Sequence, residues 1–436
     1  MIPVYFAIVL FLGLYKSLNQ NKSDFFNLSR SLTLPSFVAT LVTTWYGGIL
    51  EIGRFTFVHG IVTWVIFGFF YYLAAMIYGF LIGPKLYKNN INNIPEYFEK
   101  NYGFLSSKIC SLILILISSP APYILIFSTI LSHIYGFKME TASLIGIIMS
   151  MSYVSLGGFK SIINTDKFQF ILMYLGFSLV LFFLVKNYGG ISFIINNVSN
   201  NHLKLTGDFS IGYIFSWSFI AMITFIDPNI FQRVYSSKNE KIIKKGFLIS
   251  IFFWFIFDFL TISIGLYSFA IFKSELNISN PYLEIADKIL PNFYKEIFYI
   301  AILSVVMSTI DSFTFVSAET IKKNFLKNIN YKKGIWIGTF VTAISSFVIV
   351  NNFSNVIDIW YLSGTIGASV ILTPFINSLF FHYKTRYPEI LMIIPLISSS
   401  IWIYLKNPFS IDALYIGILT SISTLYFTSF KSSNNL

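Results

Sequence analysis

Long apolar runs recur along the whole of this chain, and they constrain its fold more than any other feature. A helix needs roughly 20 mainly apolar residues to cross the hydrocarbon core of a bilayer. Of the 436 residues, 55% are hydrophobic and 11% are charged, against about 25% charged in soluble proteins. We therefore predict an all-α membrane protein with about 13 transmembrane helices, near residues 3–18, 34–59, 61–83, 107–134, 140–157, 166–186, 210–231, 247–272, 293–325, 334–351, 355–382, 388–405 and 410–430.

The connections between these runs are short, so residues 1–436 are expected to form a single polytopic domain. The longest, near residues 187–209 and 273–292, are expected to hold short interfacial helices. Cys110 is alone and the four histidines are far apart in the sequence, which argues against a disulfide and a metal centre. No catalytic triad or phosphate-binding loop is apparent, so we expect neither enzyme activity nor a cofactor.

The positive charge is distributed by side of the membrane. Lysine and arginine favour the connections that follow odd-numbered runs, together with the tail at Lys431, by about three to one. Cytoplasmic loops carry such an excess. We therefore expect an inner (plasma) membrane protein with its N-terminus outside and its C-terminus in the cytoplasm. A nucleic-acid-binding protein would instead gather the net charge of +11 on one folded face, so nucleic acid is not expected as a partner.

The second run contains a sequence that fits a continuous helix poorly. Thr43 and Thr44 precede Gly47 and Gly48 near the middle of the bilayer. Unwound backbone at that depth is tolerated where it lines a cavity, and broken helices coordinate small cations in transporters. Glycines that serve close helix packing are the alternative interpretation, and the pattern alone does not choose between them.

Glu51 and Arg54 follow in the same run, three residues apart and hence on one helical face. One interpretation is a mutual ion pair that makes the span tolerable in lipid. The other is a direct role in solute recognition or gating, because charges within a membrane usually face a bundle interior or a water-filled path. Pairing and function do not exclude each other.

The ninth run concentrates oxygen ligands within about one helical turn, at Ser308, Thr309, Asp311 and Ser312. Hard cations favour oxygen ligands, so this cluster together with carbonyls of a broken helix predicts a sodium site. Serine and threonine hydroxyls also bond to the carbonyl four residues earlier in a purely structural way. That alternative fits Ser304 better than it fits the cluster.

Further acids interrupt apolar sequence at Asp166, Asp227 and Asp258. Asp258 is interpreted either as an ion or proton relay or as a hydrogen-bond acceptor for a neighbouring helix. Asp227, beside Pro228 near the inner end of the seventh run, is expected to be structural. Arginine occurs at four positions in a lysine-rich chain, which suggests that a planar, forked donor is needed where it persists.

Five short motifs occur in order along nearly the whole chain. They are SDFFNLSRSL at residues 23–32, IPEYFEKNYG at 94–103, GGFK with TDKFQ at 157–169, DPNIFQR at 227–233 and MSTIDS at 307–312. Each motif is weak alone, but in this order they resemble those of the sodium/solute symporter family. That family includes bacterial proline, pantothenate, sialic acid and sugar transporters.

The resemblance implies a LeuT-type core of two inverted five-helix repeats, here about residues 34–186 and 210–382. One extra helix would precede the core and two would follow it, and the first helix of each repeat would be broken. The family's sodium site would use backbone or hydroxyl oxygens of Thr43, Tyr46, Val305, Ser308 and Thr309. A second cation or proton site would use Asp166, Asp311 and Ser312.

The resemblance also locates the solute pathway. Leu50 and the 220–223 stretch stand where sugar-transporting members have polar groups, and Trp45 stands where proline-transporting members have an acid. Neither a sugar nor proline is therefore indicated, whereas a charged or zwitterionic metabolite would suit the Glu51–Arg54 pair. The residues expected along the pathway are Trp45, Gly47, Gly48, Leu50, Glu51, Arg54 and Trp217.

These features predict a secondary transporter that couples inward movement of a small solute to sodium by alternating access. Its expected partners are the solute, the sodium ion and the lipid bilayer, and the sequence does not address oligomeric state. A proton-coupled carrier of the same fold is one alternative, for which Asp258 and Asp311 are the discriminating residues. A non-transporting sensor is another, but the signalling kinase domain of such relatives is not expected here because the sequence ends at Leu436.

Overall fold

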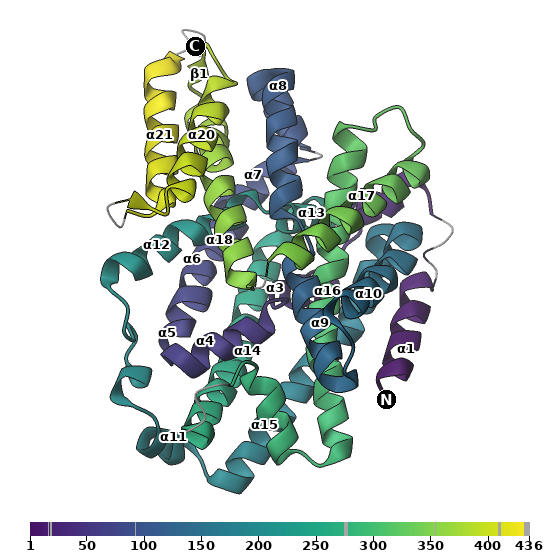
Figure 1. Ribbon diagram of the computed structural model, residues 1–436. Coiled ribbons are helices and arrows are strands. Elements are labelled where there is room, and N and C mark those ends of the chain that lie inside the picture. The colour runs from purple at the N-terminus through teal and green to yellow at the C-terminus, as the bar shows by residue number, and fades with distance from the viewer. Residues whose placement is uncertain are drawn as a thin grey trace.

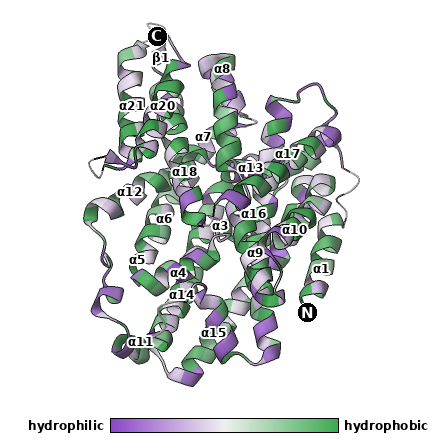
Figure 2. Ribbon diagram, in the orientation of Figure 1, coloured by the Kyte–Doolittle hydropathy of each residue, from purple (hydrophilic) through white to green (hydrophobic). Residues whose placement is uncertain are grey.

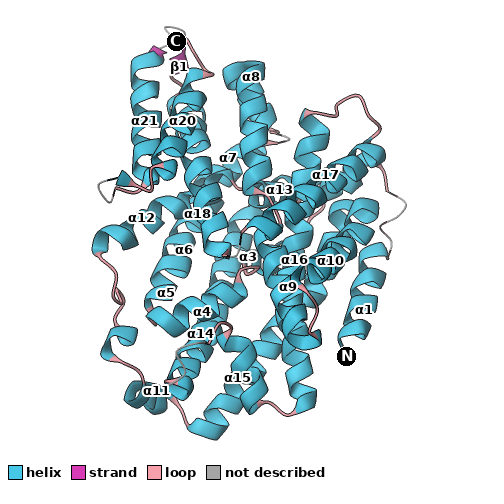
Figure 3. Cartoon of the chain, in the orientation of Figure 1, coloured by secondary structure: helices cyan, strands magenta, loops and turns pink. Residues whose placement is uncertain are grey.

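The computed structural model describes residues 1–15, 17, 20–91, 93–273, 278–353, 355–408 and 411–430. Lys431 of the predicted cytoplasmic tail and the predicted end of the first span at residue 18 lie outside these residues. The described chain is almost entirely helical (Figure 3). Two short strands, β1 (Lys384–Thr385) and β2 (Ser429–Phe430), pair antiparallel near the end of the described chain.

The helices follow one another with short connections. They are α1 (Ile2–Leu14), α2 (Lys22–Asn27), α3 (Leu34–Trp45), α4 (Ile49–His59), α5 (Val62–Trp64), α6 (Phe70–Ile77), α7 (Gly83–Lys88), α8 (Ile94–Ile117), α9 (Ala121–Tyr135), α10 (Met139–Tyr188), α11 (Ile191–Asn197), α12 (Ile211–Ala221), α13 (Pro228–Ser236), α14 (Glu240–Phe272), α15 (Pro281–Ile289), α16 (Asn292–Asn324), α17 (Tyr331–Asn352), α18 (Val356–Gly367), α19 (Thr373–Ile376), α20 (Ile390–Tyr404) and α21 (Ala413–Thr428). The short 3₁₀ and π segments are η1 (Leu28–Arg30), η2 (Val65–Phe69), η3 (Tyr78–Ile82), η4 (Asn200–Leu203), η5 (Met222–Ile226), η6 (Ala368–Leu372) and η7 (Asn377–Phe381).

Seven helical stretches of the described chain are long and apolar enough to cross a membrane. They are Val62–Lys88, Ile94–Tyr135, Met139–Tyr188, Glu240–Phe272, Asn292–Asn324, Tyr331–Asn352 and Val356–Phe381. A bent pair, Ile211–Ile226 with Pro228–Ser236, makes an eighth, and shorter apolar helices include α1, α3 and α21. The chain is therefore an integral, multi-pass membrane protein.

Large apolar side chains cover much of the outer surface. Ile148, Ile171, Phe182, Phe252 and Phe340 are each more than half exposed. Figure 2 shows such hydrophobic residues along most of the long helices. Soluble monomers rarely expose contiguous apolar patches larger than a few hundred Å², so lipid is the medium that covers these faces.

The helix α10 is 50 residues long, about 75 Å if it were straight and more than twice the roughly 30 Å hydrocarbon core. It is interrupted at Gly158, whose φ of 58° lies in the left-handed region. A side-chain carbon at that position would stand 2.6 Å from the backbone oxygen of Phe25, so only glycine fits. The runs predicted at 140–157 and 166–186 therefore meet at a single-residue break, without the loop expected between them.

The predicted connections near residues 187–209 and 273–292 contain short helices, as the sequence suggested. The first holds α11 and the second holds α15. Both pack against α14. The predicted run at 107–134 differs, because the structure places the break at residues 118–120 between α8 and α9, where Pro120 cannot donate a backbone hydrogen bond.

The helix α16 forms the centre of the molecule. Every residue of its most apolar 18-residue window is buried, and it packs against α3, α8, α9, α10 and α17 (Figure 1). Its serine, threonine and aspartate side chains at residues 304–312 are therefore shielded from lipid and water. Polar groups in such a place require partners within the protein.

Two helices are broken next to this centre. The first breaks between Trp45, where α3 ends, and Ile49, where α4 begins. The second breaks at Asp227, where η5 gives way to α13 with a bend of 42°. Pro228 provides the reason, because it has no N–H for the preceding turn. The seventh run was expected to end near residue 231, whereas α13 continues it to Ser236.

A short backbone bridge joins the two broken helices at one end. The amide of Leu32, just before α3, donates to the carbonyl of Ser236 at 3.0 Å. The amide of Lys238, just after α13, donates to the carbonyl of Leu32 at 3.2 Å. Segments about 200 residues apart in the chain are thus held side by side in a parallel bridge between Leu32 and Ser237.

Candidate functional site

The first break lies directly against α16. The hydroxyl of Thr309 is within hydrogen-bond distance of the carbonyl oxygens of Thr44 (3.0 Å) and Val305 (3.2 Å). A side-chain carbon at Gly47 would stand 2.6 Å from the Thr309 side chain. The missing side chain at residue 47 is therefore what lets the broken backbone approach α16, and oxygen atoms from both elements converge there.

Thr43 and Tyr46 flank this junction but use their side chains elsewhere. The Thr43 hydroxyl bonds to the Ala39 carbonyl at 2.9 Å, within its own helix. The Tyr46 hydroxyl lies 2.9 Å from both the Trp254 carbonyl and the Asp258 carboxylate of α14. The backbone oxygens of Thr43 and Tyr46 are the ones that the resemblance implies for the ion site, and they lie at the end of α3 beside this junction.

Asp166 lies beside the junction, at the meeting of α3, α10 and α16. Its carboxylate accepts hydrogen bonds from the hydroxyls of Ser308, at 2.7 Å, and Thr40. All three side chains are fully buried. The structure thus brings the predicted second-site acid into contact with Ser308, a residue predicted for the sodium site.

Arg233 lies close to Asp166, and the sequence did not predict this contact. Its guanidinium Nη2 lies 2.8–2.9 Å from the hydroxyls of Thr40, Thr44 and Ser312, and 3.8 Å from the Asp166 carboxylate. The side chain is fully buried although it comes from the short helix α13. The sequence offered two signals for this residue, the rarity of arginine in the chain and the DPNIFQR motif at 227–233, but neither showed which groups it contacts.

Asp311 and Ser312 face different neighbours although they are adjacent in sequence. Successive residues of a helix are rotated by about 100°, so Ser312 meets Arg233 and Thr44 whereas Asp311 meets α10. The Asp311 carboxylate accepts a hydrogen bond from Tyr153. Its second oxygen is buried without a partner among the described residues. Asp166 and Ser312 therefore share Arg233 as a neighbour, whereas the Asp311 carboxylate faces Tyr153.

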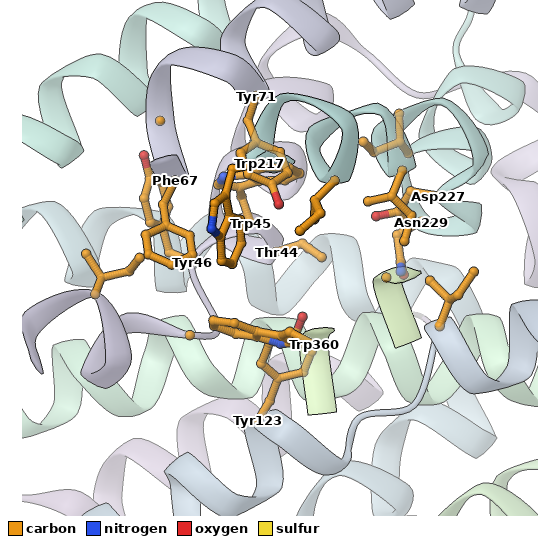
Figure 4. A pocket seen from close by; sticks show the side chains of 18 of the residues that line it. Thr44, Trp45, Tyr46, Phe67, Tyr71, Tyr123, Trp217, Asp227, Asn229 and Trp360 are labelled. Carbon is orange, nitrogen blue, oxygen red and sulfur yellow. Dashed lines mark hydrogen bonds between the residues drawn. The ribbon is translucent and has the colours of Figure 1, made fainter. Parts of the chain in front are cut away.

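A cavity of about 180 Å³ opens next to the first break. Figure 4 shows Trp45, Tyr71 and Trp217 along one side and Trp360 and Tyr123 along the other. The Trp360 ring packs on the bare backbone of Gly48, where a side-chain carbon would stand 2.0 Å from the ring. Pockets for drug-sized ligands measure roughly 300–1,000 Å³, so this cavity suits a smaller solute.

Asp227 and Asn229 form a polar end of the cavity (Figure 4). One Asp227 carboxylate oxygen accepts a hydrogen bond from the backbone N–H of Asn229 at 2.7 Å. Asp227 thereby caps the N-terminus of α13. Asn229 is 2% exposed, and its side chain lies against Asp227 without a hydrogen bond of good geometry to any of the described residues. This cap is the structural role that the sequence suggested for Asp227, and the structure also places the residue at the break and in the cavity wall.

Asp258 also lines the cavity, from α14. Its carboxylate accepts hydrogen bonds from the hydroxyls of Tyr46 and Tyr72. It therefore accepts hydrogen bonds from neighbouring helices, one of the two interpretations left open by the sequence. The Tyr46 bond also links the first break to the cavity wall.

The predicted pathway residues divide into two groups. Trp45, Gly48 and Trp217 line the cavity, whereas Gly47, Leu50, Glu51 and Arg54 do not. Glu51 and Arg54 pair with each other, with Arg54 Nε 3.4 Å from Glu51 Oε2. The Arg54 side chain is 45% exposed and the Glu51 side chain 16%, so the pair lies toward the surface of α4.

A multi-pass protein with two broken helices, a junction of oxygen ligands and an adjoining cavity has the architecture of a secondary transporter. The family model described as "Sodium:solute symporter family" matches residues 25–387. The chain belongs to this family.

The curated relatives share low sequence identity with this chain, but the similarity extends over much of its length. Sodium-coupled monocarboxylate transporter 1 of Homo sapiens is 24% identical over 360 residues, which cover 74% of this chain and 58% of that protein. The sodium/proline symporter of Haemophilus influenzae is 23% identical over 288 residues, covering 59% of this chain and 56% of that protein. The chain thus spans about half the length of the curated relatives it matches.

Solved structures share the fold over nearly the whole chain. A substrate-bound, outward-open Na⁺-coupled sialic acid symporter matches with a TM-score of 0.80 at 18% identity, covering 99% of this chain and 98% of that one. A nucleobase-cation-symport-1 family transporter matches with a TM-score of 0.60 at 13% identity, covering 94% and 95%. At these identities the likeness establishes the fold alone.

Proposed function

We propose that this chain carries a small solute into the cell by sodium-coupled symport with alternating access. The observation that carries the proposal is the junction of the first break with α16, where the Thr309 hydroxyl meets the Thr44 and Val305 carbonyl oxygens beside an aromatic cavity. An ion bound at this junction would touch both elements, and a solute in the cavity would touch the same break.

The chemistry of the junction suits sodium. The ligands available are neutral carbonyl and hydroxyl oxygens with one nearby carboxylate, Asp166, and a hard cation prefers such oxygens. The proposed ligands are the backbone oxygens of Thr43, Tyr46 and Val305 and the hydroxyls of Ser308 and Thr309. The C-terminal end of α3 points its negative dipole end toward the same place.

Coupling follows from where these ligands lie. Sodium that bridges α3 and α16 stabilises the state in which the two elements touch, and a state in which they separate binds sodium more weakly. A ligand shifts a conformational equilibrium only by its difference in affinity between the two states. Sodium and solute both contact the first break, so each favours the binding of the other, and the release of both on the inner side completes the cycle.

The architecture proposed for this cycle has thirteen spans, with inverted repeats at about residues 34–186 and 210–382. The two broken helices begin these ranges, as a LeuT-type core requires. In the inner membrane, the N-terminus would lie on the outer side and the C-terminus on the cytoplasmic side. Cysteine labelling of single-cysteine variants from either side of the membrane tests this topology.

A second ion or a proton at Asp166, Asp311 and Ser312 remains part of the proposal. The unpartnered Asp311 oxygen favours the proton-coupled alternative, because a buried carboxylate without a cationic partner is costly in lipid. Asp258 serves the same alternative from the cavity wall. Uptake driven by a pH gradient in the absence of sodium would establish that alternative.

The test of the main proposal is uptake in proteoliposomes across a metabolite panel with a sodium gradient, a proton gradient or neither. Sodium-driven uptake is expected, and Ser308→Ala/Thr309→Ala should remove its sodium dependence. Ser304→Ala is the matched control, because the Ser304 hydroxyl bonds back to the Ile300 carbonyl at 2.7 Å on the same helix and otherwise meets Tyr5, away from the junction. Uptake that follows pH and ignores sodium would contradict the proposal.

A further inference from the structure

We infer that the cavity binds a solute of net positive charge, an organic ammonium ion that carries one further hydrogen-bonding group. This inference rests on the proposed function, because it takes the cavity to be the solute site. It is carried by three independent properties of the cavity: the charge of its lining, its aromatic walls and an unpartnered amide at its polar end.

The charge of the lining is negative. Asp227 and Asp258 both line the cavity, and among the described lining residues Arg233 is the one cationic side chain. Arg233 is already engaged by Asp166 and three hydroxyls. Among the described residues neither Asp227 nor Asp258 has a cationic group within ion-pair distance, although Arg233 is near enough to attract Asp227 more weakly. A sodium ion at the junction neutralises one further carboxylate, which still leaves negative charge for the solute to balance.

The walls are the kind that hold a cation without a salt bridge. Trp45, Tyr71, Trp217, Tyr123 and Trp360 surround the cavity (Figure 4). The rings of Trp45 and Tyr71 meet edge to face with centroids 5.1 Å apart, and those of Tyr123 and Trp360 are tilted at 6.3 Å. An ammonium group over an aromatic face gains roughly 0.5–2 kcal/mol, and a set of such faces selects a bulky ammonium over a hydrated metal ion.

The polar end of the cavity favours a solute that carries a second group able to form hydrogen bonds. The Asn229 side chain lies against the Asp227 carboxylate and the Trp360 indole nitrogen lies near the Tyr123 hydroxyl, but none of these side-chain nitrogen and oxygen atoms of Asn229 and Trp360 makes a hydrogen bond of good geometry among the described residues. A buried amide left without partners costs about 1–3 kcal/mol. A hydroxyl or amide on the solute would satisfy Asn229 while the ammonium group faces Asp227 and the aromatic rings.

Other solute classes fit these groups less well. A monocarboxylate would place a negative charge beside Asp227 and Asp258, with no free cation to receive it. A sugar would require many convergent hydrogen-bond partners, whereas most of the lining is aromatic or aliphatic. The volume of about 180 Å³ also favours a compact solute over a disaccharide or a nucleoside.

The experiment compares solutes in proteoliposomes under an inward sodium gradient. The probes are choline, ethanolamine and tetramethylammonium as ammonium ions, betaine as a zwitterion, lactate as an anion and glucose as a neutral sugar. Choline or ethanolamine should be taken up, tetramethylammonium should compete more weakly, and lactate and glucose should do neither. Uptake of lactate or glucose, stronger binding of betaine, or no competition by any ammonium ion would overturn the inference.

Asp227→Asn tests the charge without removing the helix cap, because asparagine caps helices as well as aspartate does. The apparent affinity for the ammonium solute should fall at least about tenfold, since a charge-assisted contact is lost, while sodium affinity stays unchanged. Asp24→Asn is the control: Asp24 lies in the first turn of α2, accepts a hydrogen bond from the Ser29 hydroxyl and does not line the cavity. Unchanged ammonium affinity in Asp227→Asn would refute the role of Asp227.

Sodium binding measured without solute separates this inference from the proposed function. If ²²Na⁺ binds to the unaltered protein and is lost in Ser308→Ala/Thr309→Ala, but no ammonium ion binds, only the inference fails. If ²²Na⁺ does not bind and uptake of every probe ignores sodium, the proposed function fails as well.

Discussion

The two broken helices of this protein are built from different chemistry. The first break, between Trp45 and Ile49, is made by Gly47 and Gly48, and it presents backbone oxygens to α16. The second, at Asp227 and Pro228, is made by a proline and an acidic cap, and it presents side chains to the cavity. Backbone oxygens are the same in every sequence, whereas side chains vary. The comparison teaches that ion binding and solute choice can be assigned to separate breaks.

Helix dipoles reinforce this division. The C-terminal end of α3 carries partial negative charge toward the proposed sodium site, and the N-terminal end of α13 carries partial positive charge toward Asp227. Arg233 on α13 bonds to Thr40 and Thr44 of α3. The two breaks are therefore chemically distinct but physically joined, and the following substitutions act on one, on the other or on the link.

The largest effect is expected from replacing Arg233, which links the two breaks. Arg233→Met leaves Asp166 buried without its cation, which typically costs about 3–5 kcal/mol. The melting temperature in detergent should fall steeply, and both sodium and solute affinity should weaken together. Arg386→Met is the control, because Arg386 contacts the Phe430 ring far from the breaks. Loss of solute binding alone would show that Arg233 belongs to the second break and does not join the two.

Removal of the ion ligands should act next most strongly. In Ser308→Ala/Thr309→Ala, two polar contacts to a cation are lost, each of about 1.5–3 kcal/mol, so sodium affinity should fall about a hundredfold or more. Solute affinity at saturating sodium should change far less, because neither residue lines the cavity. Sodium titrations of uptake and of ²²Na⁺ binding measure the sodium affinity. An equal loss of affinity in Ser304→Ala would show that Ser308 and Thr309 are not specific sodium ligands.

Gly47→Ala should have a moderate effect confined to the first break. The added carbon would stand 2.6 Å from Thr309, and such overpacking costs about 1–3 kcal/mol. Sodium affinity should fall several-fold as Thr309 is displaced. Gly364→Ala is a matched control in the cavity wall, because its nearest neighbour would be 3.7 Å away. Equal effects of the two substitutions would indicate general damage to the fold.

The smallest effect is expected from Tyr46→Phe. The substitution removes the hydroxyl that bonds to Asp258 and the Trp254 carbonyl, at a cost of about 1 kcal/mol. Because only the side chain changes, the proposed Tyr46 carbonyl ligand is kept and sodium affinity should hold while solute affinity shifts a few-fold. Tyr174→Phe, which loses a bond to the Phe253 carbonyl outside the cavity, is the control.

The sequence indicates the long elements and the first break well. The predicted runs at 247–272 and 293–325 nearly match α14 and α16, because uninterrupted apolar sequence leaves a helix few alternatives in lipid. Gly47 and Gly48, next to two threonines, indicated a possible break because this sequence fits a continuous helix poorly. Local sequence chemistry was sufficient for the long helices, whereas for the first break it left close helix packing as an equal alternative, and the structure shows the break between α3 and α4.

The cavity was much less predictable. Trp360, Tyr123 and Asn229 come from three helices that are far apart in the chain, and only tertiary packing brings them together. Asp311 and Ser312 show the opposite problem, because neighbours in sequence face different elements. Arg233 was visible in a family motif, but its contacts with Thr40 and Ser312 depend on how α13 packs on α3 and α16.

The bridge between Leu32 and Ser237 consists of backbone hydrogen bonds alone. Alanine scanning would miss it, since every side chain in both segments can be trimmed while both bonds persist. Lys238→Pro is the change that would reveal it, because proline removes the amide that donates to Leu32. The connection between the two broken helices therefore depends on the backbone of these segments and can be tested only by changes that remove an amide.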